Sequence, residues 1–490
     1  MLNFGLLSSV GWVWLALEWA IRLGALFVVP RNRKPSSAMA WLLVIFFLPE
    51  VGIILFLVLG NPKLPKARRQ AQKTLDGFII RTLKQLQKTH TDRELLTATA
   101  PPKYVPLAAL SESLSHLPVF AGNKVEVLPE YDDVMTRIVR DIDEARYHVH
   151  LEYFIICLDE ITMPIFDALA RAVVRGVIVR VMYDSFSSKL YPDFKNMVKR
   201  LESDGVHVQA MLPLRRPGKG YVRPDLRNHR KLVVIDGHTG YTGSQNLVRR
   251  DYHRKDSIYY DEMVVRVQGP VVLQLAAVFL TDWYSETGVI LGRGDLGTVP
   301  ATVEKYGDSL AQILPSGPGY EDENNLKLFT ALIHLAQKRI IITNPYFVPD
   351  DALTTAITSA ARRGVEVVMI NSEVMDQWLV GHAQRSFYEV LLKAGVKIYW
   401  YKAPILLHSK FITVDDEIAT IGSSNLDIRS FELDLEVTMI SYDPKVVKAL
   451  GKVETQYLQR SKLITLPWWQ KRHRKDQLFD NIARLTSALQ

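Results

Sequence analysis

The sequence predicts an α/β protein of two related halves, preceded by two N-terminal transmembrane helices. Three observations support this prediction. A motif of the form H-x-K-x-x-x-x-D, followed by G-S-x-N, occurs at residues 229–246 and again at 408–425. Apolar periodicities that alternate between helix and strand surround both copies, and two long apolar stretches open the chain. A motif that is repeated together with its surroundings indicates a duplicated unit.

The chain is expected to divide into four parts. Its 490 residues are enough for a membrane segment and two domains with complete cores. The four parts are a pair of transmembrane helices at 1–62, a basic amphipathic helix with a linker at 63–120, a first half at 121–300, and a second half at 301–490 that ends in a basic tail.

Two apolar stretches in the first part have the length that a bilayer core requires. They cover residues 6–29 and 38–59, and a helix of about 20 apolar residues spans a bilayer. Glu18 and Arg22 interrupt the first stretch one helical turn apart and are expected to pair. Pro49 interrupts the second stretch, which leaves a re-entrant hairpin as the alternative to a full crossing. A cleaved signal peptide is disfavoured, because a second apolar stretch follows the first.

Charge and cysteine content narrow the class of partner. The formal net charge of +8 indicates an anionic partner, and the apolar stretches favour anionic lipid over nucleic acid. The denser basic cluster, at 63–73, favours a cytoplasmic catalytic domain. Residues 66–96 predict a basic amphipathic helix, which either lies on the membrane surface or links the domains. The single Cys157 rules out an internal disulfide, and the scattered histidines disfavour metal-dependent catalysis.

Both halves show the pattern of an α/β sandwich. In the first half, a helix that ends at Arg175-Gly176 leads into a strand at 177–183. The second half repeats this order, since Arg363-Gly364 echoes Arg175-Gly176 and Tyr346-Phe347 echoes Tyr153-Phe154. The duplication is therefore expected to involve the fold as well as the motif.

Each motif copy carries the side chains that a phosphate site needs. The runs 232–235 and 411–414 are apolar and β-prone, as in buried strands. A His and a Lys two positions apart point to the same face of a strand, and the G-S-x-N turn can direct amides toward an anion. For one copy alone, a buried core His and a solvated Lys explain the pattern as well as a site does. The duplicated set favours the site.

The residues around both motifs resemble the phospholipase D superfamily, and in particular its cardiolipin synthase branch. The resemblance rests on the two motifs, on the segments 223–231, 241–246 and 424–430, and on the N-terminal membrane segment, so that it covers nearly the whole chain. It implies a pseudo-twofold fold in which both motifs meet in one cleft, with the two transmembrane helices in front of two α/β/α sandwich halves.

The resemblance also implies a role for each motif residue. His229 is expected to be the nucleophile and His408 the general acid and base, although two nearly symmetric copies do not themselves reveal which His attacks. The residues expected to bind the phosphoryl oxygens are two lysines, two asparagines and two supporting serines: Lys231, Lys410, Asn246, Asn425, Ser244 and Ser423.

Four carboxylates complete the candidate site. Glu262 aligns with the acidic residue that holds a catalytic imidazole in this family, and Glu436 fills that role in the second half. Asp236 and Asp415 close the two motifs, and both are expected to position a loop because they end buried strands. The family usually has Asn where this chain has Asp434.

Two basic segments have more than one interpretation. Residues 215–230 hold six Arg or Lys that crowd the approach to His229, either as a headgroup funnel or as a solvated surface. Near the C-terminus, Trp468 and Trp469 precede the basic residues 471–475. This pairing suits a membrane surface, or simply the solvated start of a helix.

The expected function is that of a membrane-bound phosphatidyltransferase. Two phosphatidylglycerol molecules would give cardiolipin and glycerol through a phosphatidyl-histidine intermediate, without a metal or other cofactor. The chain is expected to be a multi-pass protein of the bacterial inner membrane, in contact with anionic lipid and not with nucleic acid. A homo-oligomer is compatible with the sequence.

Several alternatives stay open at this point. A phospholipase D hydrolase, a serine phospholipid synthase and a nuclease share the motif chemistry, and a lipid-binding scaffold with an inactive site belongs to a different class. Phosphatidylethanolamine and CDP-diacylglycerol are further donors that the sequence does not exclude.

Overall fold

A computed structural model describes residues 9–31, 33–89, 93–216, 220–252, 258–291 and 303–485 of the chain. The chain forms two compact units, Met1–Lys63 and Leu64–Gln490. Each unit is described by itself below.

The N-terminal unit contains three apolar helices. They are α1 (Ser9–Val28), α2 (Pro35–Phe47) and α3 (Pro49–Leu59). Among the described residues, α1 is the one helix long and apolar enough to cross a membrane, with a mean hydropathy of 1.4 over Gly11–Val28. The expected second membrane helix at 38–59 is not a single helix, because α2 ends at Phe47 and α3 begins at Pro49. Proline has no N–H to donate and clashes with the preceding turn, so it ends α2.

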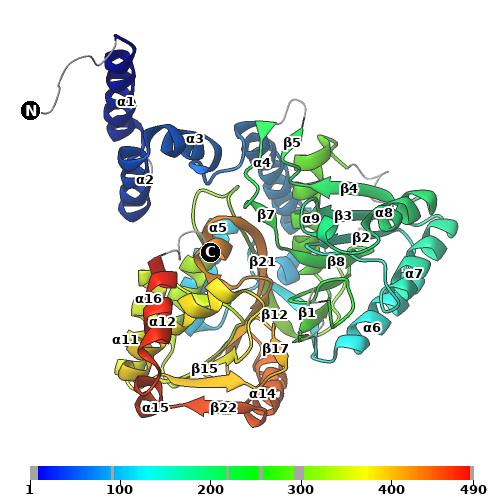
Figure 1. Ribbon diagram of the computed structural model, residues 1–490. Coiled ribbons are helices and arrows are strands. Elements are labelled where there is room, and N and C mark those ends of the chain that lie inside the picture. Colours follow the sequence, from blue (N-terminus) through cyan, green and yellow to red (C-terminus); the bar gives the residue numbers. More distant parts are fainter. Residues whose placement is uncertain are drawn as a thin grey trace, which may run out of the picture. The chain divides into compact units, whose positions relative to one another are not determined.

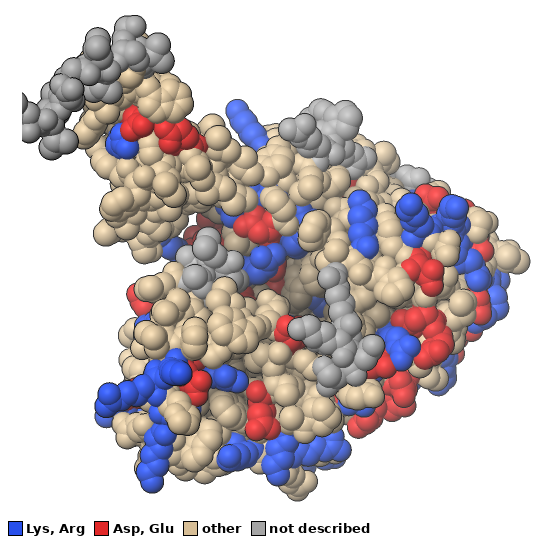
Figure 2. All heavy atoms as spheres, viewed as in Figure 1, with Lys and Arg blue, Asp and Glu red and all other residues tan. Residues whose placement is uncertain are grey.

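The helices α2 and α3 fold back on each other. Gly52 permits the close approach, because a Cβ at this position would lie 2.7 Å from the Cα of Ile45. The expected pair between Glu18 and Arg22 is confirmed, with Nη1 of Arg22 2.9 Å from Oε2 of Glu18. Arg22 also donates from Nε to the carbonyl oxygen of Phe46, at 3.1 Å, and so satisfies a carbonyl at the end of α2. Apart from a few charged groups, the surface of these helices is uncharged (Figure 2).

The second unit is organised around one continuous mixed sheet of 16 strands, of which fifteen follow one strand order and the sixteenth, β7 (Arg227–Asn228), lies off it (Figure 1). The strands of the first half, in chain order, are β1 (Phe120–Leu128), β2 (His148–Tyr153), β3 (Ile178–Asp184), β4 (His207–Met211), β8 (Lys231–Ile235), β9 (Thr239–Gly243) and β11 (Val264–Gln268). The strands of the second half are β12 (Ser309–Ser316), β13 (Arg339–Thr343), β15 (Glu366–Ser372), β16 (Lys397–Tyr401), β18 (Phe411–Val414), β19 (Ile418–Gly422), β21 (Asp434–Ser441) and β22 (Ser461–Ile464).

The strand order confirms the expected duplication. The first half runs β1-β11-β9-β8-β2-β3-β4, and the second runs β12-β21-β19-β18-β13-β15-β16 with β22 added at its edge. The two halves join through β1 and β12, which pair antiparallel where Phe120 faces Ala311. The motif strands β8 and β18 thus occupy equivalent places in the two halves.

Helices cover both faces of the sheet. On one face lie α6 (Tyr131–Glu144), α7 (Met163–Val174) and α8 (Phe194–Ser203) of the first half, and α5 (Val105–Ser115), α10 (Asn324–Leu335), α11 (Asp351–Arg362) and α12 (Trp378–Ala394) of the second. On the other face lie α9 (Val272–Thr287) and α14 (Pro444–Gln459), whose apolar residues share one core. Strand alternation separates the layers: Val233 and Ile235 of β8 face the first group, whereas Leu232 and Val234 face α9.

The expected amphipathic helix is α4 (Lys66–Thr89), which packs on α9. Its residues Leu75 and Leu83 are buried, so that much of the apolar stripe faces the domain. Arg68 is also buried and pairs with Glu286 of α9. Because α4 buries much of its apolar stripe against the domain, it fits the interpretation of residues 66–96 as a linker helix.

The first glycine of each G-S-x-N segment lies where two strands meet. A Cβ on Gly422 would lie 2.3 Å from the carbonyl oxygen of Val437, and one on Gly243 would lie 2.3 Å from that of Met263. A Cβ atom does not approach a carbonyl oxygen this closely in proteins. The glycine is therefore needed at each place for the motif hairpin to pair with its neighbour, β11 in the first half and β21 in the second.

This close approach gives a stability prediction. Gly422→Ala is expected to lower the free energy of unfolding by about 1–3 kcal/mol, because the strands must separate to admit the methyl group. Guanidinium unfolding of the detergent-solubilised protein, followed by circular dichroism, measures the change. The control is Gly77→Ala in α4, where a Cβ meets nothing within 4 Å and the substitution is expected to stabilise the helix by about 0.5–1 kcal/mol. Equal effects of the two substitutions would contradict the prediction.

Candidate active site

The two halves exchange short strands at the motifs. β7 (Arg227–Asn228), which leads into the first motif, pairs parallel with β21 of the second half. In the same way β17 (Ile405–Leu407), which leads into the second motif, pairs parallel with β10 (Tyr259–Asp261) of the first half. The N–H of His229 donates to the carbonyl oxygen of Leu435 at 2.9 Å, and the N–H of His408 donates to that of Asp261 at 2.7 Å.

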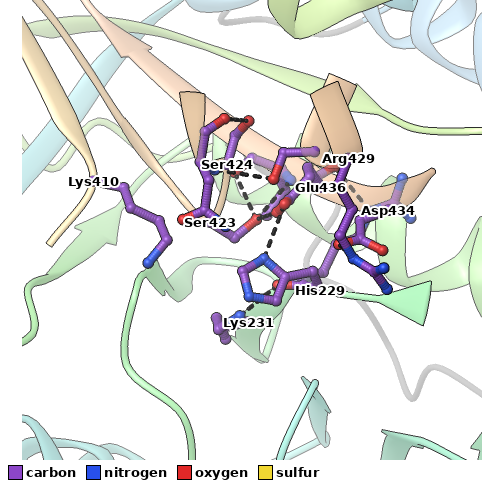
Figure 3. Close-up of polar contacts among 12 residues, drawn as sticks. His229, Lys231, Lys410, Ser423, Ser424, Arg429, Asp434 and Glu436 are labelled. Atoms are coloured by element: carbon purple, nitrogen blue, oxygen red, sulfur yellow. Dashed lines mark hydrogen bonds and ion pairs between the residues drawn. The ribbon is translucent and has the colours of Figure 1, made fainter. Parts of the chain in front are cut away.

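This exchange holds each imidazole with a carboxylate from the other half. Nδ1 of His229 lies 2.9 Å from Oε1 of Glu436 (Figure 3), and Nδ1 of His408 lies 2.8 Å from Oε1 of Glu262. The sequence identifies both carboxylates but not the exchange. Because each glutamate follows directly on the strand segment that pairs beside the opposite motif, the crossed arrangement is built into the backbone.

The pairing fixes the chemistry of the histidines. Burial lowers the pKa of His229 to about 4, with Glu436 opposing and Lys231 adding to this shift. Burial also lowers the pKa of His408. With Nδ1–H donated to the carboxylate, the neutral ring presents the lone pair of Nε2 away from the glutamate. Both imidazoles are therefore neutral, each with a lone pair ready to attack or to accept a proton.

A buried lysine accompanies each imidazole. The ammonium of Lys231 donates to the carbonyl oxygen of His229, and that of Lys410 to the carbonyl oxygen of His408, each at 2.7 Å. Figure 3 shows the Lys410 side chain directed toward the space beside the His229 ring. Burial lowers the pKa of Lys231 to about 7, and repulsion from Lys410 adds to this shift. Burial also lowers the pKa of Lys410 to about 8, and for both lysines Glu436 and Glu262 favour the charged form.

The lysine pKa values predict an alkaline limit of activity. Because these values are lowered, the ammonium forms that bind phosphate prevail below about 7 to 8 and are lost as the pH rises through this range. We expect kcat/KM, which reports the free enzyme, to fall there, well below the ordinary range of lysine. A pH profile of kcat/KM with detergent-dispersed phosphatidylglycerol measures this decrease. A kcat/KM that stays constant up to the ordinary lysine pKa would contradict the prediction.

The serines of the G-S-x-N segments adjoin the carboxylates. The hydroxyl of Ser423 donates to Oε2 of Glu436 and accepts from the N–H of Val437 at 3.0 Å. The hydroxyl of Ser244 accepts from the N–H of Met263 at 2.9 Å, next to Glu262. Burial alone would raise the pKa of Glu436, but His229, Lys231 and Ser423 outweigh it and lower that pKa. Both glutamates therefore stay ionised.

The asparagines of the two G-S-x-N segments differ in their hydrogen bonds. Oδ1 of Asn246 accepts from the N–H of Ile155 at 3.3 Å, and its Nδ2 donates to the hydroxyl of Tyr252 at 3.4 Å. Oδ1 of Asn425 is buried and has no hydrogen-bond partner among the residues that the structure describes. A buried amide oxygen without a partner is costly, so Asn425 is a polar group that a ligand can satisfy.

Asp236 and Asp415 bind backbone, as expected from their position at the strand ends. The carboxylate of Asp236 accepts from the N–H groups of residues 146–148, and that of Asp415 accepts from those of residues 337–339, at 2.7–2.8 Å. Lys103 also donates to Asp415 at 2.6 Å. These bonds tie each motif hairpin to the neighbouring strand β2 or β13. Among the described residues, no group of three or more His, Cys, Asp or Glu could hold a metal ion.

Comparison with known proteins agrees with this arrangement. The sequence profile of the family described as "Cardiolipin synthase, PLD-like domain" matches residues 138–283 and 329–456, one segment in each half. The profile described as "Phospholipase_D-nuclease N-terminal" matches residues 20–61. The chain belongs to the cardiolipin synthase family. This family is the branch of the phospholipase D superfamily that the motifs indicate.

Individual relatives match over the whole chain. Cardiolipin synthase A of Proteus mirabilis is 32% identical, over 98% of this chain and 99% of the relative. Cardiolipin synthase A of Klebsiella pneumoniae is 34% identical, over 95% of both chains. The crystal structure of phosphatidylserine synthase from Haemophilus influenzae superposes with a TM-score of 0.58 at 17% identity, over 78% of this chain and 99% of that chain, which supports the fold alone.

In this member of the cardiolipin synthase family, the two imidazoles have different neighbours. The ring of Phe154 meets His229 edge-on at 4.9 Å. His408 lies between Tyr260 and Tyr346, at 5.6 and 5.9 Å, and the hydroxyls of both tyrosines donate to Asp376. Sequence analysis did not identify Asp376 or Tyr260 as site residues. Their signal is weak, since they lie in loop and short-strand segments outside the repeated motif.

The strand register shows that one expected correspondence between the two halves is wrong. The sequence places Tyr346-Phe347 opposite Tyr153-Phe154. In the structure, however, Phe347 pairs with Leu426 and Ile156 pairs with Leu247. Because Leu247 and Leu426 each follow the motif asparagine, Ile156 is the partner of Phe347, and the apparent echo is displaced by two residues.

The basic residues of the segment 215–230 do not form a funnel where the structure describes their side chains. Arg230 is buried and pairs with Asp282, and Arg227 is buried and pairs with Asp184. Arg223 binds its neighbour Asp225. The side chains of residues 215–219 lie outside the described part of the structure. The arginines that can be placed therefore stabilise the loop around the first motif.

Asp434 is a buried acid beside the first motif. It shares a face of β21 with Glu436, and Figure 3 shows it close to Arg429, whose Nε donates to Oδ2 at 3.1 Å. Burial raises the pKa of Asp434 to about 7, Arg429 opposes this shift, and Glu436 adds to it. A partly protonated aspartate can donate a hydrogen bond, as the amide of an asparagine does.

Proposed function

We propose that this protein is a membrane-bound phosphatidyltransferase that makes cardiolipin and glycerol from two molecules of phosphatidylglycerol. One observation carries the proposal: each imidazole is held by a carboxylate of the opposite half and is accompanied by a lysine. This arrangement provides two imidazole groups at one site, as two successive displacements at phosphorus require. Membership of the cardiolipin synthase family and the nature of its curated relatives support the choice of substrate.

In the first displacement, Nε2 of His229 attacks the phosphorus of one phosphatidylglycerol. The bond from phosphorus to the glycerol headgroup breaks, and His408 gives its Nε2 proton to the departing oxygen. His408 carries this proton once substrate is bound, because the negative phosphate raises the pKa of a nearby imidazole. The products of this step are glycerol and a phosphatidyl group on His229.

In the second displacement, neutral His408 takes the proton from a headgroup hydroxyl of the second phosphatidylglycerol. That oxygen attacks the phosphatidyl-histidine, the phosphorus–nitrogen bond breaks, and cardiolipin forms. Lys231 and Lys410 neutralise the phosphoryl oxygens as charge develops, and the amides of Asn246 and Asn425 orient them. We assign Ser244 and Ser423 to the support of Glu262 and Glu436.

Water exclusion favours transfer over hydrolysis. His229 and His408 are only 7% and 5% exposed, so a lipid hydroxyl that enters with its chain has an advantage over bulk water. The N-terminal unit is proposed to anchor the catalytic domain at the inner membrane of a bacterium. In this arrangement α1 crosses the bilayer, the hairpin of α2 and α3 inserts beside it, and the catalytic domain lies in the cytoplasm.

The test is to incubate the detergent-purified protein with phosphatidylglycerol labelled in its headgroup and to analyse the lipids by mass spectrometry. We expect one cardiolipin and one labelled glycerol for every two substrates consumed. Phosphatidic acid as the main product would make the protein a hydrolase. Turnover with phosphatidylethanolamine or CDP-diacylglycerol alone would change the donor, and cleavage of nucleic acid alone would overturn the proposal.

A further inference from the structure

The second half carries an apolar surface formed by two helices, α12 and α16 (Arg474–Leu485). We call it the α12–α16 face. It consists of large apolar side chains that are 40–85% exposed: Trp378, Leu379, Leu478, Phe479, Ile482 and Leu485. Single exposed apolar residues are ordinary on protein surfaces, but a contiguous group marks an interaction site.

The helix α16 is held firmly by its other side. Asp480 and Ala483 are buried against α12, and Oδ1 of Asp480 lies 2.7 Å from Nδ1 of His382. Arg472 donates to the second oxygen of Asp480 at 2.7 Å. The exposed stripe of α16 is therefore the outer side of an amphipathic helix that is fixed in place by its packing on α12.

Cations adjoin this face. The segment Lys471–Leu485 holds five Lys or Arg and two Asp, and one of these aspartates, Asp480, is neutralised within the fold. Lys471, Arg474 and Lys475 are exposed, and Lys462 lies over the ring of Trp468, which is itself 41% exposed. Figure 2 shows Lys and Arg gathered where α15 (Leu466–Gln470) and β22 lie, close to the start of α16. Exposed aromatic and aliphatic groups bordered by cations are typical of a surface that rests on anionic lipid.

A chain of contacts links the α12–α16 face to the site of His408. Asp376 accepts hydrogen bonds from Tyr346 and Tyr260, whose rings flank that imidazole. Two residues later α12 begins at Trp378, which is 62% exposed and lies 6.0 Å from the ring of Phe479. A short path of bonded and packed groups thus leads from His408 to the exposed stripe.

We propose that the α12–α16 face docks on the surface of an anionic bilayer and sets the entrance beside His408 at the level of the lipid headgroups. A bilayer fits better than a protein partner, because cations border the exposed apolar stripe, and an anionic bilayer offers both the opposite charge at its surface and an apolar interior. The inference rests on the proposed function, since a second lipid substrate must reach His408 without leaving the membrane. It assigns a second membrane contact in addition to the N-terminal helices.

Site-directed spin labelling tests the docking. The only cysteine, Cys157, is buried and is replaced in a Cys157→Ala background, to which Leu478→Cys is added for the label. The full-length protein is reconstituted into vesicles of phosphatidylcholine with phosphatidylglycerol. Collisions of the label with oxygen, which concentrates in lipid, are compared with collisions with a water-soluble nickel chelate. Val174→Cys, on α7 of the first half and 88% exposed, is the matched control.

We expect the oxygen-to-nickel ratio at Leu478→Cys to be several-fold higher than at Val174→Cys, and Ile482→Cys to give the same result. Vesicles of phosphatidylcholine alone should reduce the difference. An aqueous ratio at both α16 sites would overturn the proposal, and so would spin–spin broadening in detergent, which would mean that a second copy covers the face. This readout does not depend on turnover, so it stands or falls separately from the proposed reaction.

A kinetic comparison tests whether the contact delivers substrate. The combined substitutions Leu478→Ser and Ile482→Ser are expected to lower the ratio of turnover on vesicles to turnover in mixed detergent micelles several-fold, because micelles bring lipid to the site without docking. An unchanged ratio would overturn the delivery role.

Discussion

Replacing His229 by alanine is expected to abolish both turnover and the covalent intermediate, whereas replacing His408 by alanine is expected to spare the intermediate when the leaving group needs no proton. Removal of a nucleophile costs about 10⁶-fold in a well-studied hydrolase, and loss of general acid–base help costs about 10²–10⁴-fold. The two imidazoles are nearly equivalent in geometry, so only a substrate that separates attack from protonation distinguishes their roles.

Phosphatidyl-p-nitrophenol is such a substrate, because nitrophenolate departs without protonation. Stopped-flow absorbance should show a burst of one nitrophenolate per site with His408→Ala, followed by slow turnover, since the base for the second displacement is missing. His229→Ala should give no burst. Circular dichroism of both variants is the control for folding. A burst with His229→Ala and none with His408→Ala would exchange the two roles.

The crossed carboxylates give the second large effect. Glu436→Gln is expected to impair attack by His229, and Glu262→Gln is expected to impair proton transfer by His408. The corresponding amide substitution in a Ser-His-Asp triad lowers kcat about 10⁴-fold, because it fixes the wrong tautomer of the imidazole. We expect losses of that order with phosphatidylglycerol for both variants. With phosphatidyl-p-nitrophenol, only Glu436→Gln should slow the burst.

A double-mutant cycle identifies which glutamate serves which histidine. Glu262→Gln should add little to the loss already caused by His408→Ala, because both act on the same proton transfer. Glu436→Gln combined with His408→Ala should give losses that accumulate, because the two affect different imidazoles. The reverse pattern of coupling would contradict the crossed pairs at 2.9 and 2.8 Å.

Much of the fold of the second unit follows from local sequence. Apolar runs and the glycines after helices mark the strands and helix ends in each half: Gly176 and Gly364 both have positive φ angles, of 85° and 90°, and precede β3 and β15. The duplicated motif then implies that the halves are alike. What local sequence does not contain is the exchange of β7 and β17 between the halves, because pairing between strands so far apart in the sequence leaves no periodicity in either segment.

The residues of the candidate site could likewise be predicted only in part. The motif residues could be identified because they recur with fixed spacing, and Asp236 and Asp415 bind backbone N–H groups as their position after buried strands indicates. Tyr260, which lies beside His408, and Asp376, to which it donates, could not, because both lie outside the repeated motif. The break at Pro49 was visible in the sequence, but its consequence, a hairpin closed on Gly52, depends on packing.

The central claim is that the two halves build one phosphoryl-transfer site in which His229 forms the covalent bond. The most direct measurement is peptide mapping by mass spectrometry of His408→Ala after brief reaction with phosphatidyl-p-nitrophenol. The sample is quenched in alkaline detergent, because acid hydrolyses a phosphorus–nitrogen bond. The account predicts a phosphatidyl group on the peptide that contains His229, and none with His229→Ala. A modified residue elsewhere, or an unmodified protein after a full burst, would contradict it.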